Sequence, residues 1–412
     1  MIRPSRRPLY VTGHGLVLGR RGGRLVASRD GVVVTSAPLG RISEVVLFGN
    51  VTVTTPAMTA LLAEDVPLAL LTADGRPRGR LEPPRASHIV ARRRQLELHH
   101  DDKARLRLAQ AFVRGKIHNQ DILLRRRAAG TPADEDAWAL ARRVAAAGPA
   151  AAATRSVAEL NGVEGAASGA YFRALRLLLA DGLGFRRRER HAPDVVNMLI
   201  NYTSALLREI VFGAVVAAGL DPYVSFLHVP HPGRPTLVFD LMEEWRPVLL
   251  ESTVLSVLGL RMVGPADVIA PEPPAARTAA PPGGRTAGPT AGRSAAPHPR
   301  DGIPGDVTGS TPPDAWASPG AAQADGSAGD GRGAVASRHD GGAEYPPLAP
   351  RPRLRPEATA AVIERFRARV DSPARTWGPA TGVTYGSQIR AQCLALRQTL
   401  LDGVPYEPFR WR

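Results

Sequence analysis

Cysteine is almost absent from this 412-residue chain, whose single thiol is Cys393. One thiol can form neither an intramolecular disulfide nor a cysteine-based zinc knuckle, and such usage is typical of a reducing compartment. Cys393 lies in a run of helical period, so we expect a small buried residue there. Long apolar runs are lacking too, and residues 1–7 have no apolar stretch behind their basic residues, so we expect no signal peptide. We therefore expect a cytoplasmic protein with no membrane partner.

Lysine is nearly as scarce, since Lys103 and Lys116 are the only lysines among 53 basic residues. The formal net charge of +15 favours a polyanionic partner such as nucleic acid. Arginine, which supplies the other basic residues, binds phosphates in a bidentate manner and stays charged when partly buried. A general bias toward Arg, Ala, Pro and Gly would give a similar composition, so the charge alone does not decide the function.

The residue pattern divides the chain into four stretches. Residues 1–82 alternate between short apolar runs and glycine turns, which predicts a small β-domain with one short helix capped by Thr55. Residues 85–263 follow a helical period and predict an α-helical domain. Pro, Gly, Ala and Ser dominate residues 264–349, which predicts a disordered linker, and residues 350–412 regain helical period. The expected fold class is α+β: a small N-terminal β-domain, then a larger all-α C-terminal domain with a long disordered insert before its last helices.

Two groups of polar residues allow a purely structural interpretation. The His-His-Asp-Asp run at residues 99–102 is contiguous, and adjacent helical residues point about 100° apart, so these side chains cannot all meet one ion. We interpret the run as a solvated helix boundary. Asp240 and Glu243 have the spacing of a capping box at the start of a helix over residues 241–260. Capping and a functional role both remain open for this pair.

Three separate motifs in residues 160–247 carry acidic and imidazole groups. Glu164 follows Leu-Asn-Gly-Val, His228 opens a His-Val-Pro-His-Pro segment, and Asp240 and Glu243 lie in an Asp-Leu-Met-Glu-Glu-Trp-Arg-Pro segment. Oxygen ligands with one imidazole suit Mg²⁺ or Mn²⁺ better than a closed zinc site. A hard-metal site in a strongly basic protein favours phosphodiester chemistry.

These motifs, in this order, resemble the family of CRISPR-associated integrases, the larger and metal-dependent subunit of the spacer-acquisition complex. The resemblance covers nearly all of the chain outside the linker. It is carried by the strand, Phe-Gly turn and strand at residues 45–53, the Gly-x-x-x-Gly-Arg-Leu close at 75–81, the Lys-Ile-x-Asn-Gln helix at 116–120, the glutamate motif at 160–172, the acidic motif at 240–247, and the C-terminal helix and tail at 385–409.

The resemblance implies a divalent-metal site made by Glu164, His228 and Glu243, occupied by Mg²⁺ or Mn²⁺. Asp240 is then an alternate ligand or a carboxylate behind the ligands. The separations of 64 residues (228 − 164) and 15 residues (243 − 228) mean that only tertiary folding can join them. By the same resemblance, the 3′-hydroxyl of a DNA fragment attacks a repeat-boundary phosphodiester, and water as attacker makes the site an endonuclease. His228 must be neutral to bind a metal, so activity is predicted to fall in acid.

The resemblance also implies partners: double-stranded DNA, a second copy joined through the β-domain, and the smaller adaptation subunit in a heterohexamer. We expect a phosphate track in the basic turn formed by Arg186, Arg187, Arg188 and Arg190, although a solvated turn between helices is equally compatible with this pattern. No cysteine or third histidine accompanies His231, so we interpret it as a loop histidine close to DNA rather than a zinc ligand. Arg246 is expected to brace Glu243 or Glu244 by a salt bridge.

Two other functions are compatible with the same residues. One is a catalytically idle DNA-binding homologue, in which the acidic residues only cap helices. The other is a general Mg²⁺-dependent, structure-selective nuclease for repair intermediates. Substitution of Glu164 separates the integrase from the idle binder, and a preference for joining over cutting separates it from the repair nuclease.

Overall fold

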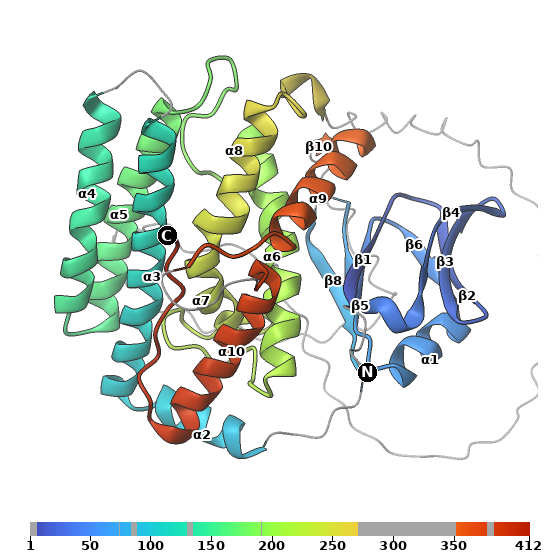
Figure 1. Ribbon diagram of the computed structural model, residues 1–412, viewed down its shortest axis with the longest axis horizontal. Helices are drawn as coiled ribbons and strands as arrows, with labels where there is room; N and C mark the ends of the chain where they lie inside the picture. Colours follow the sequence, from blue (N-terminus) through green and yellow to red (C-terminus); the bar gives the residue numbers. More distant parts are fainter. Residues whose placement is uncertain are drawn as a thin grey trace, which may run out of the picture. The chain divides into compact units, whose positions relative to one another are not determined.

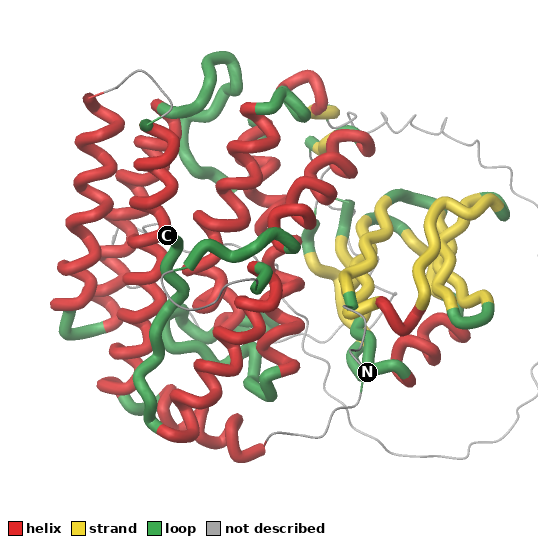
Figure 2. The backbone as a smooth tube through the Cα atoms, viewed as in Figure 1, coloured by secondary structure: helices red, strands yellow, loops and turns green. Residues whose placement is uncertain are grey.

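The computed structural model describes residues 6–73, 75–83, 89–129, 135–190, 192–270, 352–376 and 383–412. Met1–Ala270 and Arg351–Arg412 group into one compact unit. Figure 1 traces the chain through this unit, and Figure 2 shows most of its strands gathered in the N-terminal part and most of its helices in the remainder. The α+β class is therefore confirmed.

The N-terminal part consists of two four-stranded sheets, ordered β1-β5-β7-β8 and β4-β3-β2-β6. Its one α-helix among the described residues, α1 (Thr55–Ala63), is capped by Thr54 and not by Thr55 as expected, because the Thr54 hydroxyl accepts from the N–H of Ala57. The strands are β1 Arg7–Thr12, β2 Leu16–Arg21, β3 Arg24–Arg29, β4 Val32–Pro38, β5 Ile42–Phe48, β6 Val51–Val53, β7 Leu68–Leu71 and β8 Pro77–Leu81.

The interior strand β5 of the first sheet packs into two hydrophobic cores, one in the β-domain and one among the helices. Successive side chains of a strand point to opposite faces of its sheet. Val45 and Leu47 accordingly pack into a core between the two sheets, whereas Val46 and Phe48 pack into the helical core. Phe48 reaches Tyr202 of a helix, with ring centroids 5.1 Å apart. The first sheet therefore has both faces buried and belongs to two cores.

Helices make up most of the rest, and their ends follow local capping rules. Asp101 accepts hydrogen bonds from the N–H groups of Lys103 and Ala104, which confirms a helix boundary at residues 99–102. Asp194 caps helix α6 (Val195–Ala217) by accepting a hydrogen bond from the N–H of Asn197. Gly219 follows the end of this helix with a φ of +77°. The helices are α2 Ile89–His99, α3 Asp102–Ala128, α4 Glu135–Ala153, α5 Val157–Leu177, α6 Val195–Ala217, α7 Thr236–Trp245, the π turn η2 Arg246–Glu251, α8 Ser252–Gly259, α9 Pro356–Val370 and α10 Tyr385–Asp402, with 3₁₀ turns η1 Leu39–Arg41 and η3 Pro265–Asp267.

Helix α6 corrects one expectation. Within the described residues it is long and apolar enough to cross a bilayer, with a mean hydropathy of 1.4, although no such run was expected. About 72% of its most apolar window is buried in the protein, which is the burial of a core helix.

The predicted start of the disordered linker, residue 264, is too early by at least seven residues, because residues 264–270 contain regular structure. Residues 264–270 are described and contain η3 and strand β9 (Val268–Ile269), which pairs antiparallel with β10 (Arg353–Leu354). The β-branched pair Val268-Ile269 restores strand propensity inside a Pro- and Ala-rich stretch. The helical part is consequently not all-α. Residues 271–349 of the predicted linker lie outside the described residues.

Candidate functional site

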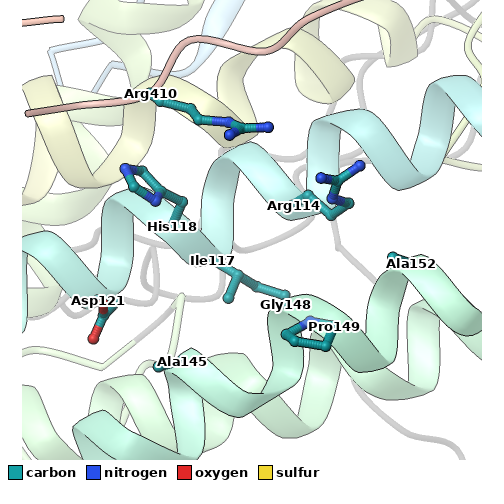
Figure 3. A pocket seen from close by; sticks show the side chains of 9 residues that line it. All are labelled: Arg114, Ile117, His118, Asp121, Ala145, Gly148, Pro149, Ala152 and Arg410. Atoms are coloured by element: carbon teal, nitrogen blue, oxygen red, sulfur yellow. The ribbon is translucent and has the colours of Figure 1, made fainter. Parts of the chain in front are cut away.

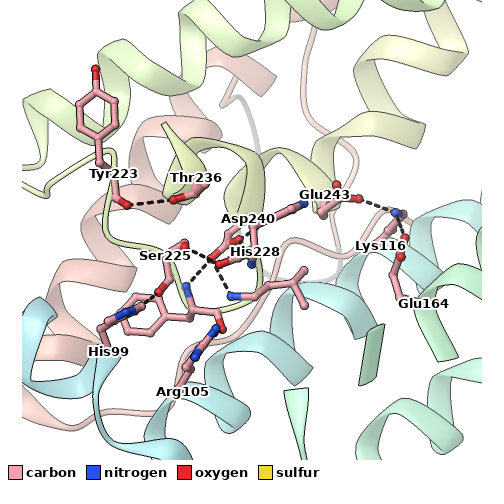
Figure 4. Close-up of polar contacts among 12 residues, drawn as sticks. His99, Arg105, Lys116, Glu164, Tyr223, Ser225, His228, Thr236, Asp240 and Glu243 are labelled. Atoms are coloured by element: carbon pink, nitrogen blue, oxygen red, sulfur yellow. Dashed lines mark hydrogen bonds and ion pairs between the residues drawn. The ribbon is translucent and has the colours of Figure 1, made fainter. Parts of the chain in front are cut away.

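Glu164 and Glu243 meet at the ammonium group of Lys116 (Figure 4). Helices α3, α5 and α7 bring Lys116, Glu164 and Glu243 together from three places in the sequence. Lys116 Nζ contacts Glu164 Oε1 and lies 2.5 Å from Glu243 Oε2. Ser168, one turn further along α5, donates a 2.8 Å hydrogen bond to the same oxygen of Glu164. The structure thus joins two of the predicted ligands around a cation of the protein itself.

Asp240 orients the imidazole of His228. It lies inside α7 and is completely buried, and its carboxylate accepts hydrogen bonds from the backbone N–H groups of Phe226 (2.6 Å), Leu227 (3.0 Å) and His228 (3.0 Å). His228 Nδ1 lies 2.7 Å from Asp240 Oδ1. An ionised carboxylate only accepts, so Nδ1 donates this bond and Nε2 is left to bind a cation.

The capping-box interpretation of Asp240 and Glu243 is wrong. Helix α7 begins at Thr236 rather than near residue 241, so Asp240 lies within the helix and caps nothing. Pro235 is the N-cap residue, a position where its missing N–H costs no hydrogen bond within the helix.

Charge shifts the pKa values of the cluster. Burial raises the pKa of Glu243, but the charges of Lys116, Arg246 and His228 outweigh burial and lower it to about 2. Burial is likewise outweighed by Lys116 at Glu164, whose pKa is lowered. Burial lowers the pKa of Lys116, but Glu164 and Glu243 outweigh it and raise that pKa well above the ordinary value. Both carboxylates are therefore ionised at neutral pH.

His228 belongs to the same electrostatic cluster. Burial lowers its pKa, but the hydrogen bond to Asp240 and the charges of Asp240 and Glu243 outweigh burial and raise it. As the side chains stand, no three His, Cys, Asp or Glu residues in the described part of the chain are grouped closely enough to hold a metal ion. The ammonium of Lys116 occupies the space between the two carboxylates instead.

Arg246 and Glu251 lie behind the carboxylates on a π turn. Pro247 has no N–H to offer the carbonyl of Glu243 and would obstruct a regular α-helix, and the π register of η2 accommodates it. Arg246 Nε lies 3.9 Å from Glu251, and Tyr171 donates a 2.9 Å hydrogen bond to the same carboxylate. The expected salt bridge of Arg246 to Glu243 or Glu244 is thus made to Glu251, although Glu243 is close enough to raise the pKa of Arg246 against the effect of burial.

The C-terminal tail is anchored to the residue next to Glu243. Glu244 is completely buried and accepts hydrogen bonds from the Tyr406 hydroxyl (2.7 Å) and the Phe409 N–H (2.5 Å). Asn119 of α3 donates to the carbonyls of Glu244 and Phe409 and accepts from the N–H of Trp411. The tail therefore joins α3 to α7 close to Lys116 and Glu243.

The predicted phosphate track is only partly accessible. Arg186 and Arg187 are exposed, and Arg187 pairs with Glu189 at 3.2 Å. Arg188 is half-buried and donates to Asn197 (3.0 Å) and Asn201 (2.6 Å) of α6. Burial, together with the charge of Arg246, lowers the pKa of Arg188 to about 10. Arg188 thus fastens the turn to α6.

Two further predicted residues lie on the edges of these loops. Arg190 is half-buried and has an interaction partner. His231 is exposed, and its Nδ1 lies 3.0 Å from the carbonyl of Pro232. Neither residue touches the carboxylate pair in any contact described above.

A recess of about 290 Å³ opens between α3 and α4 (Figure 3). Its lining residues include none of Lys116, Glu164 and Glu243. Arg114 and His118 of α3 and Arg410 of the tail line it. Arg114 and His118 are four residues apart and share one helix face, whereas Lys116 lies two residues from each and faces away. The recess therefore does not open onto Lys116.

Lys116 is the site residue that sequence analysis missed. It was noticed only as the first residue of a motif at residues 116–120. The available signal was its identity, because a compact lysine stands alone there in a chain whose other basic residues, apart from Lys103, are arginine. Its partners Glu164 and Glu243 are set by tertiary packing and leave no mark in the local sequence.

The fold is shared with solved structures along nearly the whole chain. A casposase bound to an integration product has a TM-score of 0.69 at 17% identity, over 96% of this chain and 91% of that one. A Cas6-RT-Cas1–Cas2 complex has a TM-score of 0.71 at 16% identity, over 100% of this chain and 37% of that one. The fold class is thus the one that casposases and Cas1 proteins have in common.

The sequence comparisons then give the family. The family model described as CRISPR associated protein Cas1 matches residues 9–274, which is more than half of the chain. The chain belongs to the Cas1 family.

Named relatives lie at about one-third identity. A CRISPR-associated exonuclease Cas4/endonuclease Cas1 fusion of Rhodospirillum rubrum is 36% identical over 273 residues, which are 64% of this chain and 46% of the fusion. CRISPR-associated endonuclease Cas1 3 of Thermus thermophilus is 36% identical over 258 residues, which are 62% of this chain and 75% of that protein. The chain thus spans about half of the fusion and three-quarters of the Thermus protein.

Proposed function

We propose that this protein is a divalent-metal-dependent DNA endonuclease and integrase that inserts new spacers into a CRISPR array. The observation that carries the proposal is the meeting of Glu164 and Glu243 at one buried cation, with His228 oriented nearby by Asp240. Relatives that bear the name CRISPR-associated endonuclease Cas1 support the same chemistry.

The donor set fits Mg²⁺ or Mn²⁺. Two ionised carboxylates and one imidazole are ligands that these hard cations accept, and the protein already stabilises positive charge between the carboxylates. In this proposal Glu164, Glu243 and Nε2 of His228 are the ligands. Asp240 is the carboxylate that holds the ring, because its oxygens are already engaged by four hydrogen bonds.

Each group of the chain has a defined task in this chemistry. A bound divalent ion lowers the pKa of an attacking hydroxyl and offsets charge on the phosphate. Glu164 and Glu243 supply the negative charge that retains the ion. Asp240 keeps Nδ1 of His228 protonated, which leaves Nε2 as the ring atom that would hold the ion. A DNA 3′-hydroxyl as attacker gives joining, and water gives cleavage.

Three partners follow from this proposal. Double-stranded DNA fits the net charge of +15, with Arg186 and Arg187 as the accessible part of the phosphate track. A smaller adaptation subunit is supported by the Cas1–Cas2 content of the solved complex with this fold. A homodimer through the β-domain is supported by edge strand β4, where Val32, Val33 and Val34 are 70%, 49% and 59% exposed.

A strand-joining assay tests the proposal. The protein, the small partner subunit, a duplex with 3′-hydroxyl ends and a supercoiled repeat plasmid are combined with Mn²⁺ or with EDTA. We expect joining only with Mn²⁺, and we expect Glu164→Ala, His228→Ala and Glu243→Ala each to abolish it while DNA binding persists. Glu357→Ala, at an exposed acid on α9, is the matched control.

The other outcomes identify the rival functions. Joining that survives Glu243→Ala and is lost in Asp240→Ala moves the third ligand to Asp240. DNA binding without metal-dependent joining or cutting in the wild type indicates the idle binder. Metal-dependent cutting without joining indicates a repair nuclease.

A further inference from the structure

The cation between Glu164 and Glu243 is a side chain of the protein, the ammonium group of Lys116. Lys116 Nζ contacts Glu164 and Glu243 at once, and the side chains of Lys116 and Glu243 are each only 9% exposed. The Glu164 side chain is 25% exposed, and two carboxylates that share one ammonium group repel each other unless a cation lies between them. Among the contacts described here, only Lys116 touches both.

A divalent ion bound by the same two carboxylates needs the same space. Magnesium–oxygen distances of roughly 2.0–2.1 Å are even shorter than the 2.5 Å between Lys116 Nζ and Glu243 Oε2. The ammonium and the ion therefore cannot both lie between the two carboxylates. Two like charges this close would also repel each other in a poorly solvated site.

We propose that Lys116 is an internal counter-ion that closes the Glu164–Glu243 pair in the metal-free protein, and that a divalent ion binds there only by displacing its ammonium group. This inference rests on the proposed function, because it uses the same two carboxylates. It makes the affinity for metal lower than the carboxylates alone would provide, because the ion competes with the Lys116 ammonium group for the same two carboxylates.

The choice of lysine fits this role in an arginine-rich chain. An ammonium on a flexible four-carbon stem is a point charge that can swing away. A guanidinium forms a planar, bidentate pair with carboxylates and is harder to displace. The structure thus gives a reason for one of the two lysines of the sequence to stand at this position.

Metal affinity gives the first test, by titration calorimetry with Mn²⁺ and no DNA. We expect Lys116→Met to bind Mn²⁺ at least about tenfold more tightly than the wild type, because the competing charge is gone. Lys116→Arg should bind more weakly than the wild type. Lys103→Met is the matched control, since Lys103 is exposed and lies roughly 20 Å away along α3. Equal or weaker binding by Lys116→Met overturns the proposal.

Stability without metal gives the second test. In EDTA we expect Lys116→Met to lower the melting temperature, and Glu164→Gln with Glu243→Gln in the same chain to restore it by removing the repelling charges. Lys103→Met should leave the melting temperature unchanged. A Lys116→Met protein as stable as the wild type in EDTA contradicts the counter-ion role.

Wild-type protein provides a readout that needs no variant to fold. Because the chain has two lysines, labelling lysine with ¹³C at the ε-carbon gives two NMR signals. Added Mg²⁺ should shift the Lys116 signal and leave that of Lys103 in place, and an unmoved Lys116 signal at saturating Mg²⁺ overturns displacement.

The metal site and the displacement of Lys116 can be disproved separately. If Glu164→Gln with Glu243→Gln leaves wild-type Mn²⁺ binding unchanged, no metal binds at these carboxylates, and the proposed metal site fails together with displacement. If that double variant abolishes binding but Lys116→Met binds no more tightly than the wild type, only the role of Lys116 fails.

Discussion

Asp240 holds His228 twice, accepting from its ring Nδ1 at 2.7 Å and from its backbone N–H at 3.0 Å. The same carboxylate accepts from the N–H groups of Phe226 and Leu227. One side chain therefore fixes both the path of the loop and the direction of the imidazole. Loop folding and ring orientation cannot be separated at this point.

Asp240→Asn should impair both properties. The asparagine NH₂ group would face N–H donors whose hydrogen bonds the Asp240 carboxylate accepts in the wild type, so hydrogen bonds are lost. We therefore expect a lower melting temperature and a joining rate about 10–100-fold lower. The measurements are thermal unfolding and the initial rate with Mn²⁺. Asp402→Asn, at an exposed residue at the end of α10, is the control. An unchanged rate would show that Asp240 does not orient a working imidazole.

The anchor of the C-terminal tail can be tested with one hydroxyl. Tyr406→Phe removes the donor to the buried carboxylate of Glu244. We expect the free energy of unfolding to fall by about 1–3 kcal/mol, because a buried acceptor is left with fewer partners. Urea unfolding measures it, with Tyr223→Phe as the matched control because Tyr223 is 47% exposed. Equal losses in the two variants would exclude a specific anchor.

Glu44 predicts a pH dependence of stability. Burial raises the pKa of Glu44 from 4.5 to about 7, against the opposing charge of Arg80. The folded protein then keeps a proton that the unfolded chain releases, so this contribution is complete below pH 4.5 and is lost as pH rises through about 7. Glu209 and Glu82, which also face Glu44, act in the same direction as burial.

Glu44→Gln should remove this part of the pH dependence. Between about pH 5 and about pH 8 we expect the wild type to lose on the order of 1–3 kcal/mol more stability than the variant. Urea unfolding at the two pH values measures the difference. Glu64→Gln, whose native side chain is 46% exposed, serves as control. Parallel pH profiles of wild type and Glu44→Gln would contradict the prediction.

Edge strand β4 predicts how two copies associate. Val33→Glu places a charge among the exposed valines of β4, so we expect a dimer to dissociate to monomer in size-exclusion chromatography with light scattering. Thr52→Glu introduces the same charge on β6, at the opposite edge of the same sheet, and should leave the dimer intact. Dissociation caused by Thr52→Glu and not by Val33→Glu would place the dimer interface at β6. If both variants remain dimers, neither edge of this sheet forms the interface.

Features set by neighbouring residues were predictable from sequence. Asp101 caps α3 through Ala104, and Asp194 caps α6 through Asn197, in each case three residues away. Gly219 follows the end of α6 with a positive φ, which glycine adopts without strain. The strands of the β-domain followed from alternation in the same way. The role of β5 in two cores did not, because Val45 and Val46 are equally apolar and only packing distinguishes their faces.

The candidate site shows where local reasoning ends. Asp240 and Glu243 have capping-box spacing, yet the partners of Asp240 lie 12–14 residues earlier in a loop that folds back. The partners of Lys116 are 48 residues (164 − 116) and 127 residues (243 − 116) away. Motif resemblance could suggest that Glu164, His228 and Glu243 act together, but the lysine between two of them emerges only from the packed helices.

The pairing of β9 with β10 has a consequence for the architecture of the gene product. Ile269 pairs with Arg353 and Val268 with Leu354, so the two ends of residues 270–352 are fastened as neighbouring strands about 5 Å apart. Doubling the length of a connection between fixed ends costs only about 0.6 kcal/mol. The paired strands therefore hold Ile269 next to Arg353 whatever the length of the chain between them, so the helices that carry Lys116, Glu164 and Glu243 keep their places independently of that length.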